Sequence, residues 1–241
     1  RNVTIYDSER IIDETGTETL HSDDVYHVTF HAVDSRNRSV SNASISLAVN
    51  DNHFSSGTTN KTGRFQERIP TPVDSPGEIQ AEVYWKKVMV HDDTVMIQDN
   101  SFFEDSKELD LQVYYVGISI TDQRDHPVTN SKIIDRHSEL PEGEQIIADQ
   151  NTDAEGETLF RLPRGEQTFE ATWKDVMVNT TQVNVENDET VNLKASIYYL
   201  DIKVVDDKGI PLPHSLVRIT YPNSTKLYQS NYTDANGDIE V

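Results

Sequence analysis

Apolar and polar residues alternate over short stretches of the chain, which is the pattern of β-strands with one buried face. In the first clear stretch every second residue is apolar, at Tyr26, Val28, Phe30 and Ala32, and Asp34 follows. The same pattern returns 88 residues later and again after 84 more, at Tyr114, Val116, Ile118, Ile120 and at Tyr198, Leu200, Ile202, Val204. Asp122 and Asp206 follow these stretches. The sequence therefore predicts one unit of strands that occurs three times.

A glycine turn recurs in the middle of each unit. Its three forms are Asn60-Lys61-Thr62-Gly63, Asp153-Ala154-Glu155-Gly156 and Asp234-Ala235-Asn236-Gly237. Glycine at the fourth position before a strand suits a type I turn closed by a left-handed residue. We therefore expect Gly63, Gly156 and Gly237 to be structural turn residues. The segments that begin at Trp85 and Trp173 return to the spacing of 88 residues, although the loops before them differ in length.

Units of about 85 residues with short strands and no useful helical period predict small β-sandwiches. The expected fold class is all-β, with tandem Ig-like antiparallel β-sandwich domains. Residues 1–22 are expected to be the tail strands of a preceding repeat, 23–112 and 113–195 complete Ig-like repeats, and 196–241 the N-terminal half of a further repeat. The linkers at 113–115 and 195–199 are short, which predicts a semi-rigid rod. This pattern is expected of a window onto a longer array, in which a segment outside the chain, or a strand from a neighbouring chain, completes the half-unit.

Charge and composition exclude several classes of function. The 241 residues contain 21 Lys and Arg against 42 Asp and Glu, so the formal net charge is −21. Such a surface repels phosphate, and we therefore expect no binding to nucleic acid or anionic lipid. The chain has no cysteine, which excludes disulfides, thiolate chemistry, cysteine zinc sites and iron–sulfur clusters. No apolar run reaches the length of a transmembrane helix.

The second unit carries the motifs of a known family. Its pattern Thr152-Asp153-x-x-Gly156, Phe160-x-Leu162-Pro163-x-Gly165 and Phe169-x-Ala171 resembles the carboxypeptidase regulatory-like, transthyretin-like sandwich domain, found as tandem Ig-like modules on microbial surfaces. The first unit has Asn60 in place of the Asp and lacks the second glycine spacing, and the third stops soon after Gly237. The resemblance covers nearly the whole chain. It implies no active site, because the shared residues of the family are structural.

No motif for catalysis is present. The chain has no Gly-x-Ser-x-Gly elbow, His-Glu-x-x-His, P-loop or Gly-x-Gly-x-x-Gly, and His27, His31 and His91 lie beside strands at expected solvent-facing positions. We therefore expect no catalytic residues, no enzymatic activity and no organic cofactor.

Calcium is the one metal that the sequence leaves open. Asp234, Asn236 and Asp238 resemble the oxygen-rich start of a calcium loop, but the bidentate Glu at the twelfth position is absent and the repeated turn explains the same residues. Acidic pairs at predicted junctions or turns, namely Asp23-Asp24, Asp92-Asp93 and Asp206-Asp207, suit either a junction calcium or solvated charge.

Two further features have a chemical and a structural interpretation. Some related bacterial pilin modules form a Lys–Asn isopeptide bond, which requires a Lys on the first strand. Lys203 holds that position in the third unit, whereas His31 and Ser119 hold it in the two complete units, so we expect no crosslink there. Trp85 and Trp173 would stack on sugars if exposed, but their equivalent positions beside Val and Met favour packing.

Glycosylation sequons are the strongest local signal. Sixteen Asn and a Ser-plus-Thr fraction of 41/241 predict about 2.7 Asn-x-Ser/Thr sequons by chance. Seven are present, and the expected N-glycosylated residues are Asn2, Asn37, Asn42, Asn60, Asn179, Asn223 and Asn231. The alternative is that sequons accumulate in any chain rich in Thr and Asn. Glycosylation, acidity and the absence of cysteine together favour an archaeal cell surface.

The first functional hypothesis is a structural segment of an extracellular surface protein, such as an S-layer protein, a stalk or a filament. Its expected partners are neighbouring repeats or subunits, through self-assembly, and N-linked glycans. A second hypothesis makes the units accessory domains of a secreted hydrolase. A third makes them adhesin modules that bind through the longest expected loops, Asn50 to Thr59 and Asp135 to Gln150, whose only aromatic residue is Phe54.

Overall fold

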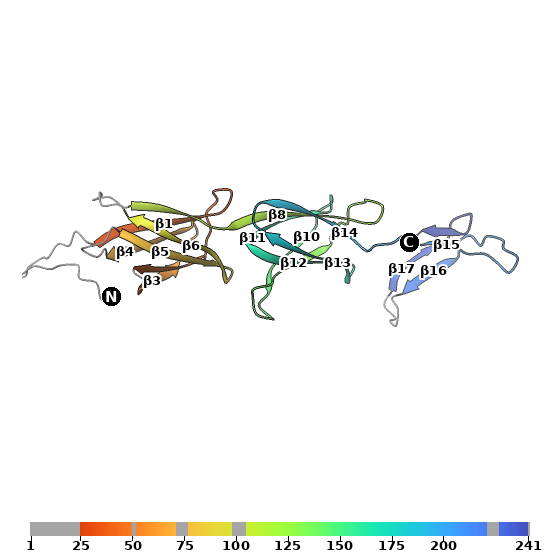
Figure 1. Ribbon diagram of the computed structural model, residues 1–241. Helices are drawn as coiled ribbons and strands as arrows, with labels where there is room; N and C mark the ends of the chain where they lie inside the picture. The colour runs from red at the N-terminus through yellow and green to blue at the C-terminus, as the bar shows by residue number, and fades with distance from the viewer. Residues whose placement is uncertain (1–24, 50–51, 71–76, 98–104, 221–226, 241) are drawn as a thin grey trace, which may run out of the picture.

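The chain folds into groups of β-strands that follow one another along an elongated molecule (Figure 1). The computed structural model describes residues 25–49, 52–70, 77–97, 105–220 and 227–240. All regular secondary structure in these ranges is strand, from β1 to β18. The predicted all-β class is therefore confirmed. The tail strands expected in 1–22 lie outside the described residues.

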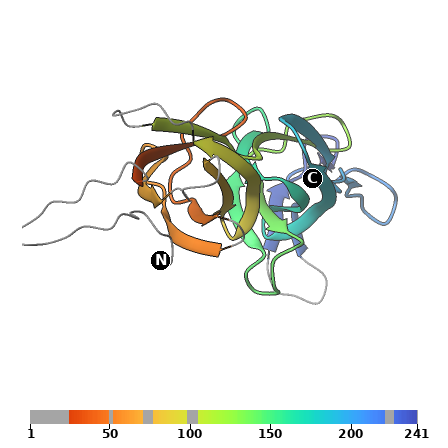
Figure 2. The ribbon, with the colours of Figure 1, turned by 60° about the vertical axis from the view of Figure 1, so that its left-hand side comes forward.

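The first sheet pair is formed by β1 to β7. Its strands are β1 (Val25–Val33), β2 (Ser44–Val49), β3 (Asn52–Thr58), β4 (Arg64–Pro70), β5 (Gly77–Trp85), β6 (Val88–Ile97) and β7 (Asp105–Asp110). One sheet has the order β4-β1-β7 and the other β3-β2-β5-β6. Phe30 and Leu109 of the first sheet and Leu47 and Ile79 of the second belong to one buried core. Figure 2 shows the two sheets facing each other across this core.

The second sheet pair repeats this arrangement with β8 to β14. Its strands are β8 (Val113–Thr121), β9 (Lys132–His137), β10 (Ile146–Asn151), β11 (Glu157–Pro163), β12 (Gly165–Trp173), β13 (Val176–Val185) and β14 (Glu189–Lys194). The sheet orders are β11-β8-β14 and β10-β9-β12-β13. Ile118, Ile133, Phe160 and Phe169 lie in its core. Successive side chains of a strand point to opposite faces, so every second residue can enter the core. Buried and half-buried residues accordingly alternate along most of β8.

Not every strand pairing is antiparallel. The last strand of each pair runs parallel to the first, β7 beside β1 and β14 beside β8. Each last strand follows a strand of the four-stranded sheet, β6 or β13, and joins the three-stranded sheet instead. This crossover brings the strand back in the direction of the first strand, which a hairpin cannot do.

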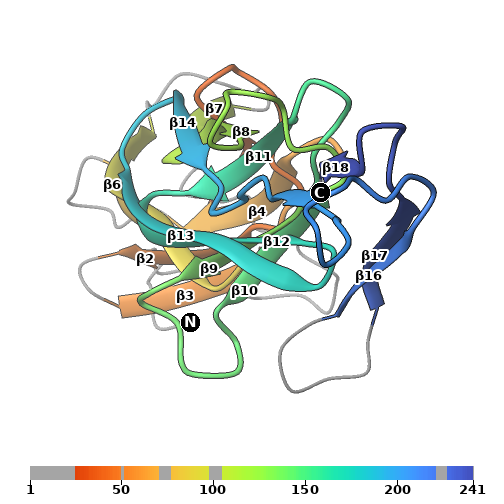
Figure 3. The same cartoon turned by 90° about the vertical axis from the view of Figure 1, so that its right-hand side faces the viewer.

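The third group of strands forms two small sheets. β15 (Asp201–Lys203) pairs with β18 (Asp238–Glu240), and β16 (Leu216–Thr220) pairs with β17 (Leu227–Tyr232). Ile239 is the only buried apolar residue among those described after Ala195. Large apolar side chains are exposed there, at Tyr198, Leu200, Val205, Ile210, Leu212, Leu216 and Tyr232. Figure 3 shows β16 and β17 to one side of the other strands.

The two tryptophans end equivalent strands, β5 and β12. Each is half-buried, and Trp85 packs against the first core while Trp173 packs against the second. The following two residues have positive φ, at 50° and 69° for Lys86 and Lys87 and at 47° and 64° for Lys174 and Asp175. Positive φ at both central residues is typical of type I′ hairpins, which continue the strand twist. These contacts support the packing role expected for both rings.

The structure corrects the two long loops expected from the sequence. Of Asn50 to Thr59, residues 52–58 form β3, which pairs with β2. Of Asp135 to Gln150, only residues 138–145 lie between β9 and β10. Small and polar residues such as Ser55, Ser56 and Gly57 hide a strand in the sequence, because the backbone makes the pairing and the side chains need not be apolar.

A buried threonine precedes each glycine turn. Thr59, Thr152 and Thr233 donate their hydroxyls to the carbonyls of Val40, Val128 and Leu212, each at 2.7 Å. Each Oγ1 also accepts a backbone N–H at 2.9 Å, from Ala43, Ser131 and Ser215. The hydroxyl thus joins the turn to the segment before the second strand in all three units.

The three turn glycines have left-handed backbones and no room for a side chain. Their φ angles are 69° at Gly63, 76° at Gly156 and 77° at Gly237. A Cβ at these positions would lie 2.7 Å from the Ala32 carbonyl oxygen, 2.6 Å from that of Ile120 and 2.6 Å from that of Val204. Because backbone cannot move as a flexible side chain does, glycine is required on steric grounds as well as by φ.

We expect Gly156→Ala to lower the free energy of unfolding of the second sheet pair by about 2–4 kcal/mol, from backbone strain and the clash with Ile120. Gly143→Ala is the matched control, because Gly143 also has a positive φ, 92°, but has nothing within 4 Å of the new Cβ. Urea unfolding measures both. Equal effects of the two variants would show that the close approach at Gly156 is unimportant.

Candidate assembly interface: the junctions between strand groups

Each unit has an aspartate-capped loop after its first strand, and we call residues 34–38, 122–126 and 206–210 the docking loops. In each loop Oδ1 of the first Asp accepts the backbone N–H of the residues two and four positions later. These distances are 2.9 Å for both bonds of Asp34, 2.8 and 2.9 Å for Asp122, and 2.9 and 2.8 Å for Asp206. The fourth residue has positive φ in every loop, at Asn37, Asp125 and Gly209. The carboxylate therefore fixes the loop with one oxygen and leaves the other available.

At the first junction, the second oxygen of Asp34 contacts the second sheet pair. The Tyr115 hydroxyl donates to Asp34 Oδ2 at 2.8 Å, and Arg161 Nη2 lies 2.7 Å from the same oxygen. Tyr115 and Arg161 stand opposite each other in the register of β8 and β11. The Asp34 side chain is fully buried, so both partners act away from water, where a hydrogen bond to a charged group is strong. Arg161 also donates to the carbonyls of Arg38 and Ser39, each at 3.1 Å.

A second carboxylate crosses the first junction in the opposite direction. Asp188, just before β14, accepts the Ser35 hydroxyl at 2.6 Å, the Tyr115 backbone N–H at 3.0 Å and Arg36 Nε at 2.5 Å. Desolvation raises the pKa of Asp188, but these hydrogen bonds outweigh it and hold the pKa below its ordinary value. The Arg36 guanidinium lies 4.0 Å above the centre of the Tyr115 ring. Burial and the bond to Asp34 both raise the pKa of the Tyr115 hydroxyl, so it remains a donor.

The β5–β6 hairpin forms the other side of the first junction. Lys86 Nζ donates to the Ile147 carbonyl of the second sheet pair at 2.9 Å, and Lys87 Nζ pairs with Glu144 at 2.6 Å. Burial lowers the pKa of Lys86, while the nearby Asp135 carboxylate raises it and Arg161 lowers it. The two sheet pairs are thus joined both at the docking loop 34–38 and at the β5–β6 hairpin.

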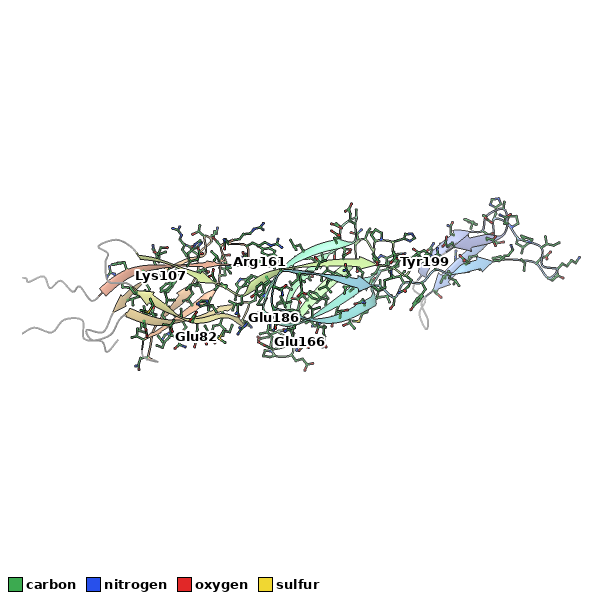
Figure 4. All side chains as sticks on the ribbon, turned by 45° about the horizontal axis from the view of Figure 1, so that its top comes forward. Glu82, Lys107, Arg161, Glu166, Glu186 and Tyr199 are labelled. Carbon is green, nitrogen blue, oxygen red and sulfur yellow. The ribbon has the colours of Figure 1, made fainter. Side chains whose placement is uncertain are left out.

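The second junction uses the equivalent residues. The Tyr199 hydroxyl donates to Asp122 Oδ2, and the Arg124 guanidinium lies 3.6 Å above the centre of the Tyr199 ring. His126 Nδ1 is 2.8 Å from the same hydroxyl, and Arg124 pairs with Glu240. Desolvation raises the pKa of Asp122, but the hydrogen bonds from Tyr199 and the loop amides outweigh this effect and hold the pKa below its ordinary value. Figure 4 places Arg161 and Tyr199 at the two boundaries between successive strand groups.

Sequence reasoning noted these aspartates only as repeat markers and did not find the junction contacts. The available signal was the fixed set Asp34, Asp122 and Asp206 with Arg36, Arg124 and Lys208 two positions later, together with Tyr115 and Tyr199 at one register of the following first strand. The contacts themselves depend on the tertiary structure, because Asp34 and Tyr115 are 81 positions apart in the sequence.

The second core contains a polar cluster where the first core is apolar. Asp135, His137 and Gln167 are fully buried, and the repeat register places them where the first unit has Leu47, Val49 and Ile79. His137 Nε2 donates to the Arg164 carbonyl at 2.8 Å and Gln167 Nε2 to the Pro163 carbonyl at 3.0 Å. Both oxygens of Asp135 lack a hydrogen-bond partner among the described residues. Desolvation therefore raises the pKa of Asp135 to about 7, although Lys86 opposes the shift.

Five of the seven sequon asparagines lie in the described ranges, and Asn2 and Asn223 lie outside them. Asn37, Asn42, Asn60 and Asn231 are exposed, and Asn179 is half-buried. Asn179 Nδ2 donates to the Lys194 carbonyl at 2.9 Å, and Asn60 Oδ1 accepts the backbone N–H of Thr62 and Arg64. Glycosylation at all seven positions stays a prediction.

The calcium candidate forms a closed turn. Asp234 Oδ1 accepts the backbone N–H of Asn236 at 2.7 Å and of Asp238 at 2.9 Å, and these bonds lower its pKa. Asp238 Oδ1 lies 3.5 Å from Nζ of Lys203. Within the described ranges, no three His, Cys, Asp or Glu side chains gather as metal ligands. Asp23 and Asp24 lie outside these ranges, and calcium binding stays untested.

Of the three histidines assigned to the solvent face, His27 is exposed and the other two are half-buried with partners. His31 Nε2 is 3.0 Å from the Ser39 hydroxyl, and His91 Nδ1 is 3.0 Å from the Asp110 carbonyl. None of the described segments forms a helix long and apolar enough to span a membrane.

Comparison with known proteins gives distant likenesses only. No protein-family model and no curated protein matches the chain. Among solved structures, it is similar to the Bacillus anthracis TIE protein, with 14% identity over 90% of this chain and 43% of that one, at a TM-score of 0.31. It is also similar to a streptococcal ancillary pilin, with 10% identity over 90% and 86% and a TM-score of 0.36. The shaft pilin SpaA of Lactobacillus rhamnosus GG gives 8% identity over 72% and 99%, with a TM-score of 0.36. At such values these likenesses carry no argument about function.

We expect Tyr115→Phe to loosen the first junction, because Asp34 loses a hydrogen bond worth about 1–3 kcal/mol in a buried site. Two spin labels on Lys61→Cys and Glu155→Cys, both exposed, report the distance between the two sheet pairs, and the chain has no other cysteine. The distance distribution should broaden in Tyr115→Phe and stay narrow in the control Tyr114→Phe. A distribution of unchanged width would show that the hydroxyl does not hold the junction.

We expect the stability of the second sheet pair to fall as pH rises from about 4 to about 7. The folded pKa of Asp135, about 7, exceeds its ordinary value of 3.8, so the folded chain retains a proton that the unfolded chain has lost. The loss is about 1.4 kcal/mol per pH unit, up to about 4 kcal/mol. Urea unfolding followed by Trp173 fluorescence, with Trp85→Phe in every sample, measures it.

Asp135→Asn should remove this slope, whereas Asp149→Asn, an exposed aspartate on the neighbouring strand, should retain it. A wild-type stability that stays level between pH 4 and 7 would mean that Asp135 is ionised in the folded chain throughout.

Proposed function

We propose that the chain is a non-enzymatic structural segment of a long extracellular surface protein, an S-layer, stalk or filament, and acts as a semi-rigid rod of tandem repeats. In this proposal 23–112 and 113–195 are complete repeats, 1–22 the tail strands of a preceding repeat and 196–241 the first half of a further one. The neighbouring repeats or subunits are its assembly partners.

The repeated junction is the observation that carries this proposal. Asp34 with Tyr115 and Asp122 with Tyr199 form the same contact twice, each with an arginine stacked on the tyrosine ring. Flexible linkers between independent domains would need no such contact, whereas a rod needs each unit held at a set angle to the next. The connections are also short, because β8 begins three residues after β7 ends and β15 begins seven residues after β14 ends.

The finer part of the proposal concerns the surface. Exposed sequons at Asn37, Asn42, Asn60 and Asn231 are accessible to a glycosylation enzyme, and the net charge of −21 keeps a long rod hydrated and apart from its neighbours. We propose N-glycosylation at these positions and a place on an archaeal cell surface, where acidic, cysteine-free proteins stay soluble at high salt.

The test uses the native protein on intact cells. Protease added outside should release peptides of this chain while a cytosolic control protein stays intact. Chemical deglycosylation should lower the intact mass in steps the size of single sugars, and glycopeptides should contain Asn37 or Asn60. A chain that is protected inside intact cells would contradict the surface assignment. A mass unchanged by deglycosylation would contradict the glycosylation alone.

A further inference from the structure

The third docking loop is built like the other two, but no following unit provides a partner for it among the described residues. Asp206 Oδ1 accepts the N–H groups of Lys208 and Ile210, Asp206 N–H donates to the Ile210 carbonyl at 2.9 Å, and Gly209 has φ 81°. In Asp34 and Asp122, Oδ2 accepts a hydrogen bond from the tyrosine hydroxyl of the next unit. For Asp206 Oδ2, the described part of the chain offers no such donor.

The first sheet pair, at the opposite end of the described strands, carries donors at the matching positions. The repeat register places His27 where the second unit has Tyr115, and Arg68 where it has Arg161. His27 and Arg68 stand opposite each other on β1 and β4, as Tyr115 and Arg161 do on β8 and β11. Both are exposed. The first sheet pair therefore presents an imidazole and a guanidinium on the side where the second presents a phenol and a guanidinium.

We propose that two copies of this chain associate head to tail, with the docking loop 206–210 of one copy receiving His27 and Arg68 of the other. Asp206 Oδ2 accepts from the Arg68 guanidinium and from a ring N–H of His27, and Lys208 takes the place of Arg36 and Arg124. This inference rests on the part of the proposed function in which neighbouring subunits are the assembly partners, because it extends the internal junction of the rod to a junction between molecules.

Charge and continuity identify the occupant as a second copy. The contact joins a carboxylate to two basic side chains. At the internal junctions the equivalent carboxylates accept from Tyr115 and Arg161 of the next unit at Asp34, and from Tyr199 at Asp122. Because the two surfaces differ and lie at opposite ends of the described strands, the contact is heterologous and repeats in one direction, giving a filament instead of a closed dimer.

The contact between molecules is weaker than the internal ones. No covalent connection raises the local concentration, and the net charge of −21 on each copy opposes approach. Lysine also lacks the planar fork with which Arg36 and Arg124 stack on tyrosine rings. We therefore expect association only at high concentration, with linear species that grow as concentration rises.

Sedimentation velocity of the full 241-residue chain tests the proposal over ~1 µM to ~1 mM at about 0.15 M salt, where contacts within ~8 Å survive screening. Asp206→Asn retains the Oδ1 acceptor that holds the loop and removes the charge. Its control is Asp153→Asn, because Asp153 caps an exposed turn with the same bonds, to Glu155 and Glu157. Arg68→Glu reverses the charge at the other end, and its control is Arg64→Glu on the same exposed face of β4.

The expected result is association of the wild type that weakens at least about tenfold in Asp206→Asn and Arg68→Glu and stays unchanged in both controls. A mixture of Asp206→Asn and Arg68→Glu chains retains one intact contact, so it should give dimers and no longer species. Equal association of all variants, with a loss in Leu216→Ser, would overturn the proposal in favour of the exposed apolar face of the third group. Absence of any association would overturn it as well.

Failure here is distinguishable from failure of the proposed function. Surface exposure and glycans of the native protein do not depend on contacts between copies. The spin-label distance across the first junction likewise reports an internal contact only. A rod that sits on the cell surface and stays monomeric would retain the proposed function and remove the head-to-tail contact.

Discussion

The arrangement of the strand groups depends on one aspartate in each junction, whose two carboxylate oxygens bind different partners. Asp34 and Asp122 hold their own loop with Oδ1 and bind the next unit with Oδ2. A carboxyl group that is fully buried, as that of Asp34 is, requires partners for both oxygens. The loop supplies half of these and the next unit the rest, so the most favourable state of the loop is the docked one. Local loop geometry thereby places the group that binds the next strand group.

The scarce basic residues gather where the acidic chain must be held together. Arg36, Arg161, Lys86 and Lys87 all contact across the first junction, and Arg124 does so at the second. With twice as many acidic as basic residues, one-to-one pairing leaves at least half of the acidic residues without a Lys or Arg partner. Repulsion between these acids favours an extended chain, while the paired cations fix the points at which neighbouring units meet. The two junctions differ in burial: Tyr115 is 6% exposed, whereas Tyr199 is half-buried.

The repeated fold tolerates opposite chemistries at the same core positions. Leu47, Val49 and Ile79 occupy the first unit where Asp135, His137 and Gln167 occupy the second, and both cores remain closed. Backbone carbonyls accept hydrogen bonds from His137 and Gln167. The favourable interaction of the Asp135 carboxylate is electrostatic attraction to Lys86 of the first unit. The stability of the second unit is therefore linked to the junction, because a residue of the first unit moderates its least favourable buried group.

The sequence by itself determined the repeat, the all-β class, the glycine turns with their positive φ, and the core face of strands such as β8, because alternation and local turn chemistry are properties of neighbouring residues. It did not reveal β3, whose small polar residues give no apolar pattern, or the parallel pairing of β7 and β14. The junctions were also hidden, since Asp34 meets Tyr115 and Arg161 only after separate strands are stacked. Tertiary structure decided these contacts, because the position of a buried charge relative to a distant donor depends on packing that no local pattern encodes.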